Sequence, residues 1–198
     1  MADHPQNAPW RIRMKVVPYS PEYRDAMRRI HLATASEKAR TDEKHGRFSL
    51  LMYCDEYLDH EHALMLVDEE NIPRGYILWA EDAHVWAENM QPYAEEIRKL
   101  GEPYIKRVED GLREYNLAYE EYPAHLHIDI LEEYTGNHHG TMLMKAMLDL
   151  LRQHHVKGVC LGVARANQRA VSFYLHNGFK VLAEDEGGFF MGQKLITD

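Results

Sequence analysis

The chain has 198 residues, 45% of them hydrophobic and 28% charged, which is the balance of an ordinary water-soluble globular protein. This length suffices for one well-buried core and is short for two, so the sequence predicts a flexible tail at residues 1–9 and a single domain at residues 10–198. The formal net charge of −9 disfavours a nucleic-acid partner, which needs a basic surface, and no apolar run reaches the roughly 20 residues that span a membrane.

The first half of the chain alternates between strand and helix patterns. The sequence predicts a strand that Pro18 closes, a helix that begins at Ser20-Pro21, a polar loop, a second helix and a hairpin. In that order, these elements are expected at residues 11–18, 21–35, 36–46, 48–62, and 63–67 with 75–80. The hairpin is the clearest of them, because two apolar runs flank a group of turn residues.

The second half begins with a charged helical stretch at residues 85–119, which Gly101-Glu102-Pro103 divides into two predicted helices. The elements that follow are a strand, a helix, a strand, a helix and two strands, at residues 124–131, 141–154, 158–164, 167–177, 180–182 and 189–195. Strands mixed with intervening helices predict an α/β or α+β fold in one domain.

The fourth predicted strand separates apolar from ionisable side chains. Leu126, Ile128 and Ile130 alternate with His127 and Asp129, and a period of two residues places the two sets on opposite faces. We expect the apolar set to face the core and the ionisable pair to lie on the non-core face.

The segment EEYTGNHHGTMLM connects this strand to the next helix, a position where free backbone N–H groups favour an anion. Glycines help there, because they allow positive φ angles and a close approach of the backbone. The residues expected to form such a site are Gly136, Asn137, His138, His139, Gly140 and Thr141. On its own, this pattern also fits an ordinary entry into a helix.

Further along, the segment ANQRAVSFYLHNGF adds a second motif. Together and in this order, the two segments resemble the GCN5-related N-acetyltransferase (GNAT) family. In that family the first loop reads Q/R-x-x-G-x-G/A and holds the pyrophosphate of coenzyme A, and the second motif reads N-x-x-A-x-x-x-Y-x-x-x-G-F. This chain matches the second motif at Asn167, Ala170, Tyr174, Gly178 and Phe179. The resemblance is close over residues 124–195, and the order of the earlier elements also fits.

The resemblance implies a GNAT-like fold, a mixed and mostly antiparallel central sheet of about seven strands flanked by helices, with residues 85–119 as a helical insertion before the fourth strand. It also implies acetyl-CoA as co-substrate and direct attack by an amine without an acyl-enzyme. In agreement, Cys54 and Cys160 belong to no visible Cys-His-Asn arrangement. A cytoplasmic location is favoured, because the N-terminus does not resemble a signal peptide and both cysteines lie in apolar surroundings.

The resemblance further implies which residues bind the cofactor. The backbone of the fourth strand at Ile128 and Ile130 is expected beside the pantetheine arm, where an N–H group would polarise the thioester carbonyl. Asn167, Ala170 and Phe173 would complete this part of the site.

The same resemblance assigns catalytic roles. Tyr174 would protonate the leaving thiolate, because a phenol keeps its proton at neutral pH. The alternative is a core aromatic residue packed near Phe179, with its hydroxyl group bonded elsewhere. Asp129 is the candidate base for the acceptor amine, directly or through a water molecule, and His127 is a second candidate.

The loop departs from the family pattern at two positions. Thr135 replaces the usual Gln or Arg, and His138 replaces the first glycine, whereas Gly140 is retained. If His138 adopts positive φ, the strain costs about 1–2 kcal/mol. Each charge-assisted N–H bond to phosphate contributes roughly 1.5–3 kcal/mol, so we expect the loop still to bind. His138 and His139 either assist the pyrophosphate or point to solvent.

The sequence does not identify the acceptor, a small-molecule or peptide amine. The resemblance implies that it is held between residues 35–47 and 184–189. The insertion at residues 85–119 either caps this cleft or forms a homodimer face. No metal is expected, because the histidine pairs lack metal-site spacing. An alternative function is a non-catalytic acyl-CoA sensor or a degenerate member of the fold, which the altered glycine pattern keeps open.

Overall fold

The computed structural model describes residues 13–196, and the predicted tail at residues 1–9 lies outside this range. Its strands are β1 (Lys15–Pro18), β2 (His62–Val67), β3 (Pro73–Ala80), β4 (Ala124–Ile130), β5 (Gly158–Ala164), β6 (Lys180–Glu184) and β7 (Gly188–Lys194). Its α-helices are α1 (Arg24–Thr34), α2 (Glu37–Thr41), α3 (Glu43–Leu50), α4 (Glu56–His60), α5 (Ala83–Asn89), α6 (Gln91–Arg98), α7 (Tyr104–Ala118), α8 (His139–Gln153) and α9 (Gln168–His176). Within residues 13–196, no helix is both long enough and apolar enough to cross a bilayer.

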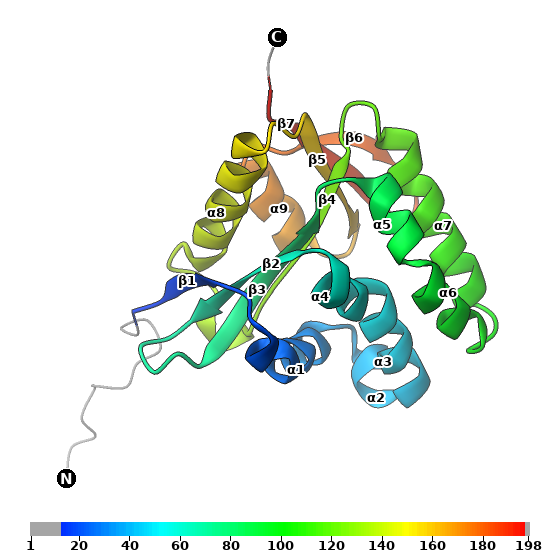
Figure 1. The fold of residues 1–198 in the computed structure, drawn as a ribbon, viewed down its shortest axis with the longest axis horizontal. Helices are drawn as coiled ribbons and strands as arrows, with labels where there is room; N and C mark the ends of the chain where they lie inside the picture. The colour runs from blue at the N-terminus through cyan, green and yellow to red at the C-terminus, as the bar shows by residue number, and fades with distance from the viewer. Residues whose placement is uncertain (1–12, 197–198) are drawn as a thin grey trace.

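The described strands form one seven-stranded sheet in the order β1-β2-β3-β4-β5-β7-β6 (Figure 1). All neighbours are antiparallel except β4 and β5, which are parallel and share only the register pairs Ala124–Val159 and His125–Cys160. Beyond His125 the two strands diverge, and the sheet divides into a β1–β4 half and a β5–β7 half. The predicted mixed, mostly antiparallel GNAT-like sheet is confirmed.

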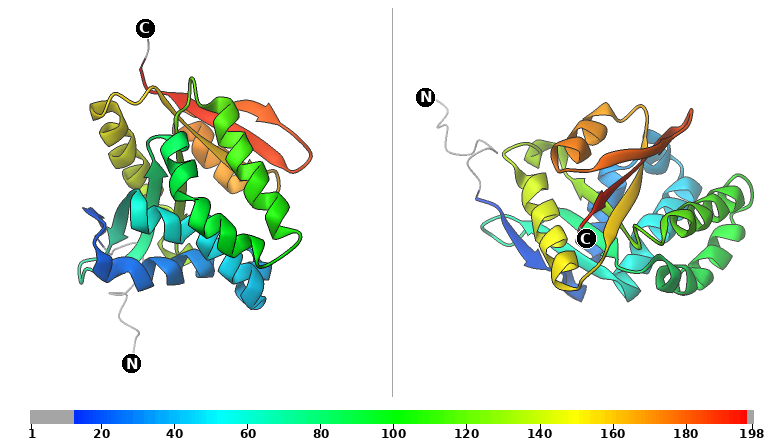
Figure 2. Two further views of the ribbon diagram at one scale, coloured as in Figure 1. Left: turned by 45° about the vertical axis from the view of Figure 1, so that its right-hand side comes forward. Right: turned by 90° about the horizontal axis from the view of Figure 1, so that it is seen from above.

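Each face of the sheet carries its own hydrophobic core. Helices α8 and α9 cover one face, which includes Leu126, whereas α1, α3–α4 and the block α5–α7 cover the other (Figures 1 and 2). The alternation predicted for β4 is confirmed, since Ile128 and Ile130 pack on the α8–α9 side. The expectation that His127 and Asp129 lie on a non-core face is wrong, because a second layer of helices covers that face as well.

The prediction of a polar loop at residues 36–46 is also wrong, because this segment forms α2 and the start of α3. Ser36 and Asp42 cap the two helices, and their side chains accept hydrogen bonds from backbone N–H groups three residues ahead. Ala39 and His45 are buried beneath the exposed charged residues. The polarity of this segment reflects one solvated helix face and not an irregular loop.

Helix α3 continues through a π-helical turn, η4 (Leu51–Asp55), into α4. The predicted helix at residues 48–62 is therefore present, but it begins at Glu43, ends at His60 and contains a wider turn that periodicity did not indicate. Such turns are frequent at functional sites, and this one carries Tyr53.

The insertion contains three helices among the described residues, not the two that were predicted (Figure 2). The break at residues 101–103 is confirmed, and a second break follows Asn89. Pro92 lies in the first turn of α6, where a missing N–H group costs nothing, so α6 starts as a new helix.

Candidate active site

The 136–141 loop has a backbone suited to an anion. Gly136, Asn137 and His138 have φ angles of 86°, 46° and 61°, so successive N–H groups turn toward one side before α8 begins. Among the described residues, none accepts a hydrogen bond from the N–H groups of His138, Gly140 or Thr141. These free donors lie at the positive end of the α8 dipole and fit a pyrophosphate.

The loop is held against α9 and β4 by contacts that require a glycine at position 140. A Cβ atom on Gly140 would lie 2.9 Å from Cε2 of Phe173 and 3.7 Å from Cδ1 of Ile130. The structure thus brings three predicted cofactor-binding residues into direct contact. It gives Phe173 a specific role, since its ring supports the back of the loop.

The two loop histidines have different environments. His138 is exposed and occupies the left-handed conformation, as anticipated for the family's glycine position. His139 is buried, and its Nδ1–H donates to the Tyr134 carbonyl oxygen at 2.8 Å. The Thr135 hydroxyl donates to the Glu132 carbonyl oxygen at 2.6 Å. The His139 and Thr135 side chains therefore fold the loop, and only His138 faces the solvent.

The gap between β4 and β5 opens beside this loop. The Leu131 N–H group donates to the Arg74 carbonyl oxygen at 2.9 Å. The backbone N–H and C=O groups of odd-numbered β4 residues therefore bond to β3, and those of even-numbered residues point away from β3, toward β5. The N–H and C=O groups of Ile128 and Ile130 consequently face the gap, where β5 has already diverged. This is the position that the sequence analysis expected for a pantetheine arm.

Helix α9 places the second motif on the other side of the gap. Asn167 caps the helix, and its Oδ1 accepts the Ala170 N–H at 3.1 Å, which leaves the amide NH₂ group free. Tyr174 is only 8% exposed, and no described residue forms a hydrogen bond with its hydroxyl. Burial, and then the charge of Asp129, raises the pKa of Tyr174 above its ordinary value. The hydroxyl of Tyr174 therefore stays protonated and lies within electrostatic reach of β4.

Asp129 is held by a chain of interior hydrogen bonds. Its Oδ2 accepts the Tyr76 hydroxyl at 2.5 Å, and Tyr76 lies directly opposite Asp129 in the β3–β4 register. His31 bonds to Tyr76 through Nδ1 at 2.9 Å and to Ser49 through Nε2 at 2.8 Å. Every donor in this hydrogen-bond network has an acceptor when His31 carries its proton on Nδ1 and Asp129 is a carboxylate. The side chain of Asp129 remains 30% exposed.

His127 and Tyr53 lie next to Asp129 on the same face. Their rings meet edge to face at 5.1 Å, and neither side chain makes a hydrogen bond within the described residues. Burial lowers the pKa of His127 to about 4, although the Asp129 charge acts in the opposite direction. A neutral imidazole with this pKa is a weak base, which favours Asp129 over His127 for that role.

Several residues of this arrangement escaped the sequence analysis. They are His31, Ser49, Tyr53 and Tyr76, which come from α1, α3, η4 and β3. Tyr76 offered the only signal, since it follows the turn of a clear hairpin, but its partner on β4 depends on the register between distant segments.

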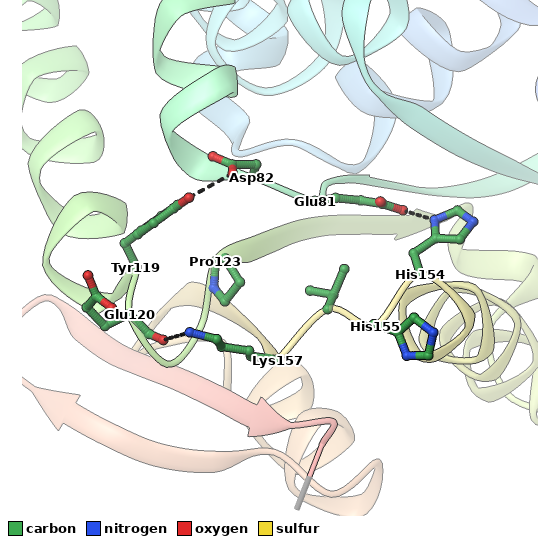
Figure 3. Close-up of a pocket in the computed structure, with 9 residues that line it drawn as sticks. Glu81, Asp82, Tyr119, Glu120, Pro123, His154, His155 and Lys157 are labelled. Carbon is green, nitrogen blue, oxygen red and sulfur yellow. Dashed lines mark hydrogen bonds and ion pairs between the residues drawn. The ribbon is translucent and has the colours of Figure 1, made fainter.

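A separate cavity of about 240 Å³ lies at the opposite end of β4 (Figure 3). Figure 3 shows His154 pointing to Glu81 and Tyr119 pointing to Asp82 across it, with hydrogen bonds of 2.7 Å and 2.8 Å. It contains none of the predicted site residues. No group of three or more His, Cys, Asp or Glu residues within 13–196 is arranged to hold a metal ion.

Residues 24–179 match the model of the Acetyltransferase (GNAT) family. This chain is a member of the GNAT acetyltransferase family. The match includes the 136–141 loop, the β4–β5 gap and the Asn167–Phe179 motif. As a GNAT acetyltransferase, the protein belongs to a class of acetyl-CoA-dependent enzymes.

Solved structures confirm the GNAT fold. SsHAT has a TM-score of 0.81 and 24% sequence identity, with 93% of this chain and 99% of SsHAT covered. A GNAT-family acetyltransferase from Staphylococcus aureus Mu50 has a TM-score of 0.59 and 11% identity, covering 93% and 100%. The yncA protein from Salmonella typhimurium, solved with its cofactor acetyl-CoA, has a TM-score of 0.54 and 14% identity, covering 94% and 96%. At these identities the likeness concerns the fold alone.

Proposed function

We propose that this protein is an N-acetyltransferase that moves the acetyl group of acetyl-CoA to a primary amine by direct attack. One observation carries the proposal. The free N–H groups of the 136–141 loop adjoin a gap in the sheet, and Tyr174 and Asp129 approach this gap from opposite faces. The loop suits a pyrophosphate, the gap suits an extended arm, and the two side chains suit proton transfer at its end.

The loop offers the donors that would bind the phosphates of the cofactor. Each N–H bond to a phosphate oxygen contributes roughly 1.5–3 kcal/mol, and His138, Gly140 and Thr141 offer free donors. The left-handed conformation of His138 costs about 1 kcal/mol, which a single such bond offsets. The yncA protein with its bound acetyl-CoA supports the same use of the fold.

When bound, acetyl-CoA supplies an activated thioester carbonyl and a thiolate leaving group. The N–H groups of Ile128 and Ile130 face the gap and are suited to stabilise negative charge on a carbonyl oxygen. Tyr174 would hold its proton toward the leaving sulfur of the bound cofactor. Because its pKa is raised, Tyr174 would act chiefly as a hydrogen-bond donor toward the leaving sulfur of a thiol of pKa about 8.5, and it would also supply the final proton.

Asp129 takes the proton that an ammonium group must lose before it attacks. Tyr76 and His31 fix the orientation of its carboxylate, and the exposed part of the side chain remains free for the amine. The negative charge also attracts a cationic amine into the gap. The same network leaves His127 as a neutral neighbour that can orient the amine without competing for its proton.

The Tyr174→Phe variant tests the proposal. In a thiol-release assay with acetyl-CoA and a panel of primary amines, we expect kcat to fall roughly 100-fold or more, since general acid catalysis contributes about 10²–10⁴. The affinity for acetyl-CoA in isothermal titration should change by less than about threefold, because the loop is untouched. Tyr122→Phe is the matched control, since this half-buried tyrosine precedes β4 by two residues and its ring lies against Gly158 and Gly192, at the end where β4 and β5 are paired.

Two results would contradict the proposal. A wild-type kcat in the Tyr174→Phe variant would remove Tyr174 from the reaction. Tight binding of acetyl-CoA without thiol release by any amine would favour the non-catalytic acyl-CoA sensor.

A further inference from the structure

The turn that joins β2 to β3 contains a buried carboxylate, Asp68, whose side chain is only 2% exposed. Its Oδ1 accepts hydrogen bonds from the N–H groups of Glu70 and Ile72, at 3.1 Å and 2.8 Å. Arg74, in β3, donates to Oδ2 through Nε at 2.8 Å, and its Nη2 pairs with the same oxygen at 2.7 Å. The guanidinium of Arg74 is therefore fixed by a charged partner that is itself bonded to the turn.

Arg74 contacts the segment before the 136–141 loop at two points. Its carbonyl oxygen accepts the Leu131 N–H at 2.9 Å. Its guanidinium carbon lies 4.7 Å from the centre of the Tyr134 ring, within the range of a cation–π contact. The β2–β3 hairpin thus supports the segment that leads from β4 into the loop, through both the backbone and the side chain of one residue.

Tyr134 ends a short 3-10 turn, η5 (Glu132–Tyr134). The internal bonds of this turn run from the Tyr134 N–H to the Leu131 carbonyl oxygen, at 2.9 Å, and from the Thr135 N–H and hydroxyl groups back into the turn, at 3.1 Å and 2.6 Å. These bonds shape the turn but do not set its direction relative to the sheet. That direction depends on the two contacts with Arg74 and on the packing of the Tyr134 ring against the core beneath α8 and α9.

The backbone of Tyr134 continues the connection into the loop. Its carbonyl oxygen accepts the Nδ1–H group of His139 at 2.8 Å, and His139 is the first residue of α8. The free N–H groups of Gly140 and Thr141 follow directly. The hydroxyl of Tyr134 forms no hydrogen bond with a described residue, so the ring face and the carbonyl are the parts of this residue that make the connection.

We propose that Arg74 and Tyr134 are positioning residues for the pyrophosphate of the cofactor. The guanidinium holds the Tyr134 ring, the Tyr134 carbonyl holds His139, and His139 fixes the start of α8, where Gly140 and Thr141 present their N–H groups. A loop ordered in advance binds more tightly, because less conformational freedom is lost on binding. The proposal rests on the proposed function and gives the β2–β3 hairpin control over cofactor affinity.

The Tyr134→Leu variant tests the ring. We expect the Kd values for acetyl-CoA and for adenosine diphosphate to rise about tenfold in isothermal titration, because the loop must then be ordered on binding. Tyr134→Phe keeps the ring face and should leave both Kd values within about twofold of wild type. Tyr119→Leu is the matched control, since Tyr119 is also stacked, with its ring 3.5 Å from that of His84, and lies at the opposite end of β4. Its loss should lower stability and leave both Kd values unchanged.

A double-mutant cycle tests whether Arg74 acts through Tyr134. Arg74→Met is combined with Asp68→Asn, which leaves no buried charge without a partner and keeps an oxygen for the turn N–H groups. These two substitutions together should raise both Kd values about tenfold, and adding Tyr134→Leu should raise them little further, because all three break one connection. Effects that multiply would show that Arg74 acts on the phosphates independently of Tyr134, and would overturn its positioning role.

Kinetics separate the position of the loop from general damage to the site. In Tyr134→Leu, the KM for acetyl-CoA should rise about tenfold with kcat within about twofold of wild type, because Tyr174 and Asp129 are untouched. With S-acetylpantetheine, which carries the thioester and lacks the pyrophosphate, kcat/KM should equal that of wild type.

Three results would count against the inference in different ways. An unchanged Kd for acetyl-CoA in Tyr134→Leu would overturn it and leave the N-acetyltransferase proposal intact. An equal loss with S-acetylpantetheine would also overturn it, because the damage would not be specific to the phosphates. A wild-type protein that binds neither acetyl-CoA nor adenosine diphosphate would refute the proposed function, and this inference with it.

Discussion

The two adjacent histidines of the 136–141 loop have different structural roles. His138 lies in the left-handed region with an exposed side chain, whereas His139 is buried and bonded to the Tyr134 carbonyl oxygen. The loop's N–H groups, and not its imidazoles, are the donors suited to phosphate. We therefore expect the side chain at position 138 to be replaceable and the one at position 139 to be required for the fold of the loop.

We expect His138→Gly to change the free energy of unfolding by less than about 1 kcal/mol, because relief of left-handed strain is offset by the greater freedom of the unfolded chain. Its affinity for acetyl-CoA should stay within about threefold of wild type. His139→Ala should lose roughly 1–3 kcal/mol of stability, because a buried carbonyl loses its donor, and should bind the cofactor more weakly. Urea unfolding measures the change in stability, and isothermal titration measures the affinity for acetyl-CoA. A tenfold loss of affinity in His138→Gly would show that its imidazole contacts the phosphate.

At the scale of elements, the continuous α3–η4–α4 helix carries a buried carboxyl group. Glu56 is fully buried, and neither of its oxygens has a hydrogen-bond partner of standard geometry, although Trp86 lies close. Burial raises the pKa of Glu56 to about 9, with Glu61 and Asp59 adding to the effect and Trp86 opposing it. The group is thus neutral in the folded protein at pH 7 and ionised in the unfolded chain.

This protonation makes the stability of the fold depend on pH. Between pH 4.5 and pH 9, unfolding releases the Glu56 proton, so stability falls as pH rises, by up to about 1.4 kcal/mol per unit. We expect Glu56→Gln, which is permanently neutral and nearly isosteric, to flatten this decline and to be more stable than wild type at pH 8. Thermal unfolding from pH 7 to pH 9 tests this, and parallel profiles for the two proteins would contradict it. Burial lowers the pKa values of His125 and His127, so these residues change the stability only below about pH 6.5, outside the range of this measurement.

At the scale of the whole molecule, the sheet consists of two halves joined at one end of a gap. Only the pairs Ala124–Val159 and His125–Cys160 connect β4 to β5. A pantetheine arm in the gap would join the halves along the remaining length of β4, where Ile128 and Ile130 direct their backbone groups. Ligand binding should therefore stabilise the molecule as a unit.

We expect acetyl-CoA at about 100 times its Kd to add roughly 2.7 kcal/mol to stability, which for a chain of this size raises Tm by about 5–10 °C. Hydrogen exchange should show new protection at Ile128 and Ile130 as well as at the start of α8. Adenosine diphosphate, which lacks the pantetheine arm, is the control and should protect α8 alone. Protection confined to α8 with acetyl-CoA would show that the arm does not occupy the gap.

Local patterns were sufficient to predict most elements of this fold. The hairpin β2–β3, the alternation along β4, the helix capped by Asn167 and the break before α7 all depend on signals a few residues long. The polar segment at residues 36–46 was misread because an exposed short helix and a loop have similar composition. The π-turn at Tyr53 was missed because periodicity does not reveal one extra residue in a turn.

By itself, the sequence determined the family, the order of the strands along the chain and the backbone that turns at Gly136, because motif spacing and residue conformation are local properties. Only the tertiary structure decided that His31 and Tyr76 orient Asp129, and that Tyr174 packs on the opposite face of the sheet from Tyr76. These relations join segments far apart in the chain through the sheet register and the packing of helices against it. Such contacts form when hydrophobic burial selects one arrangement of whole elements, and no short window of residues specifies them.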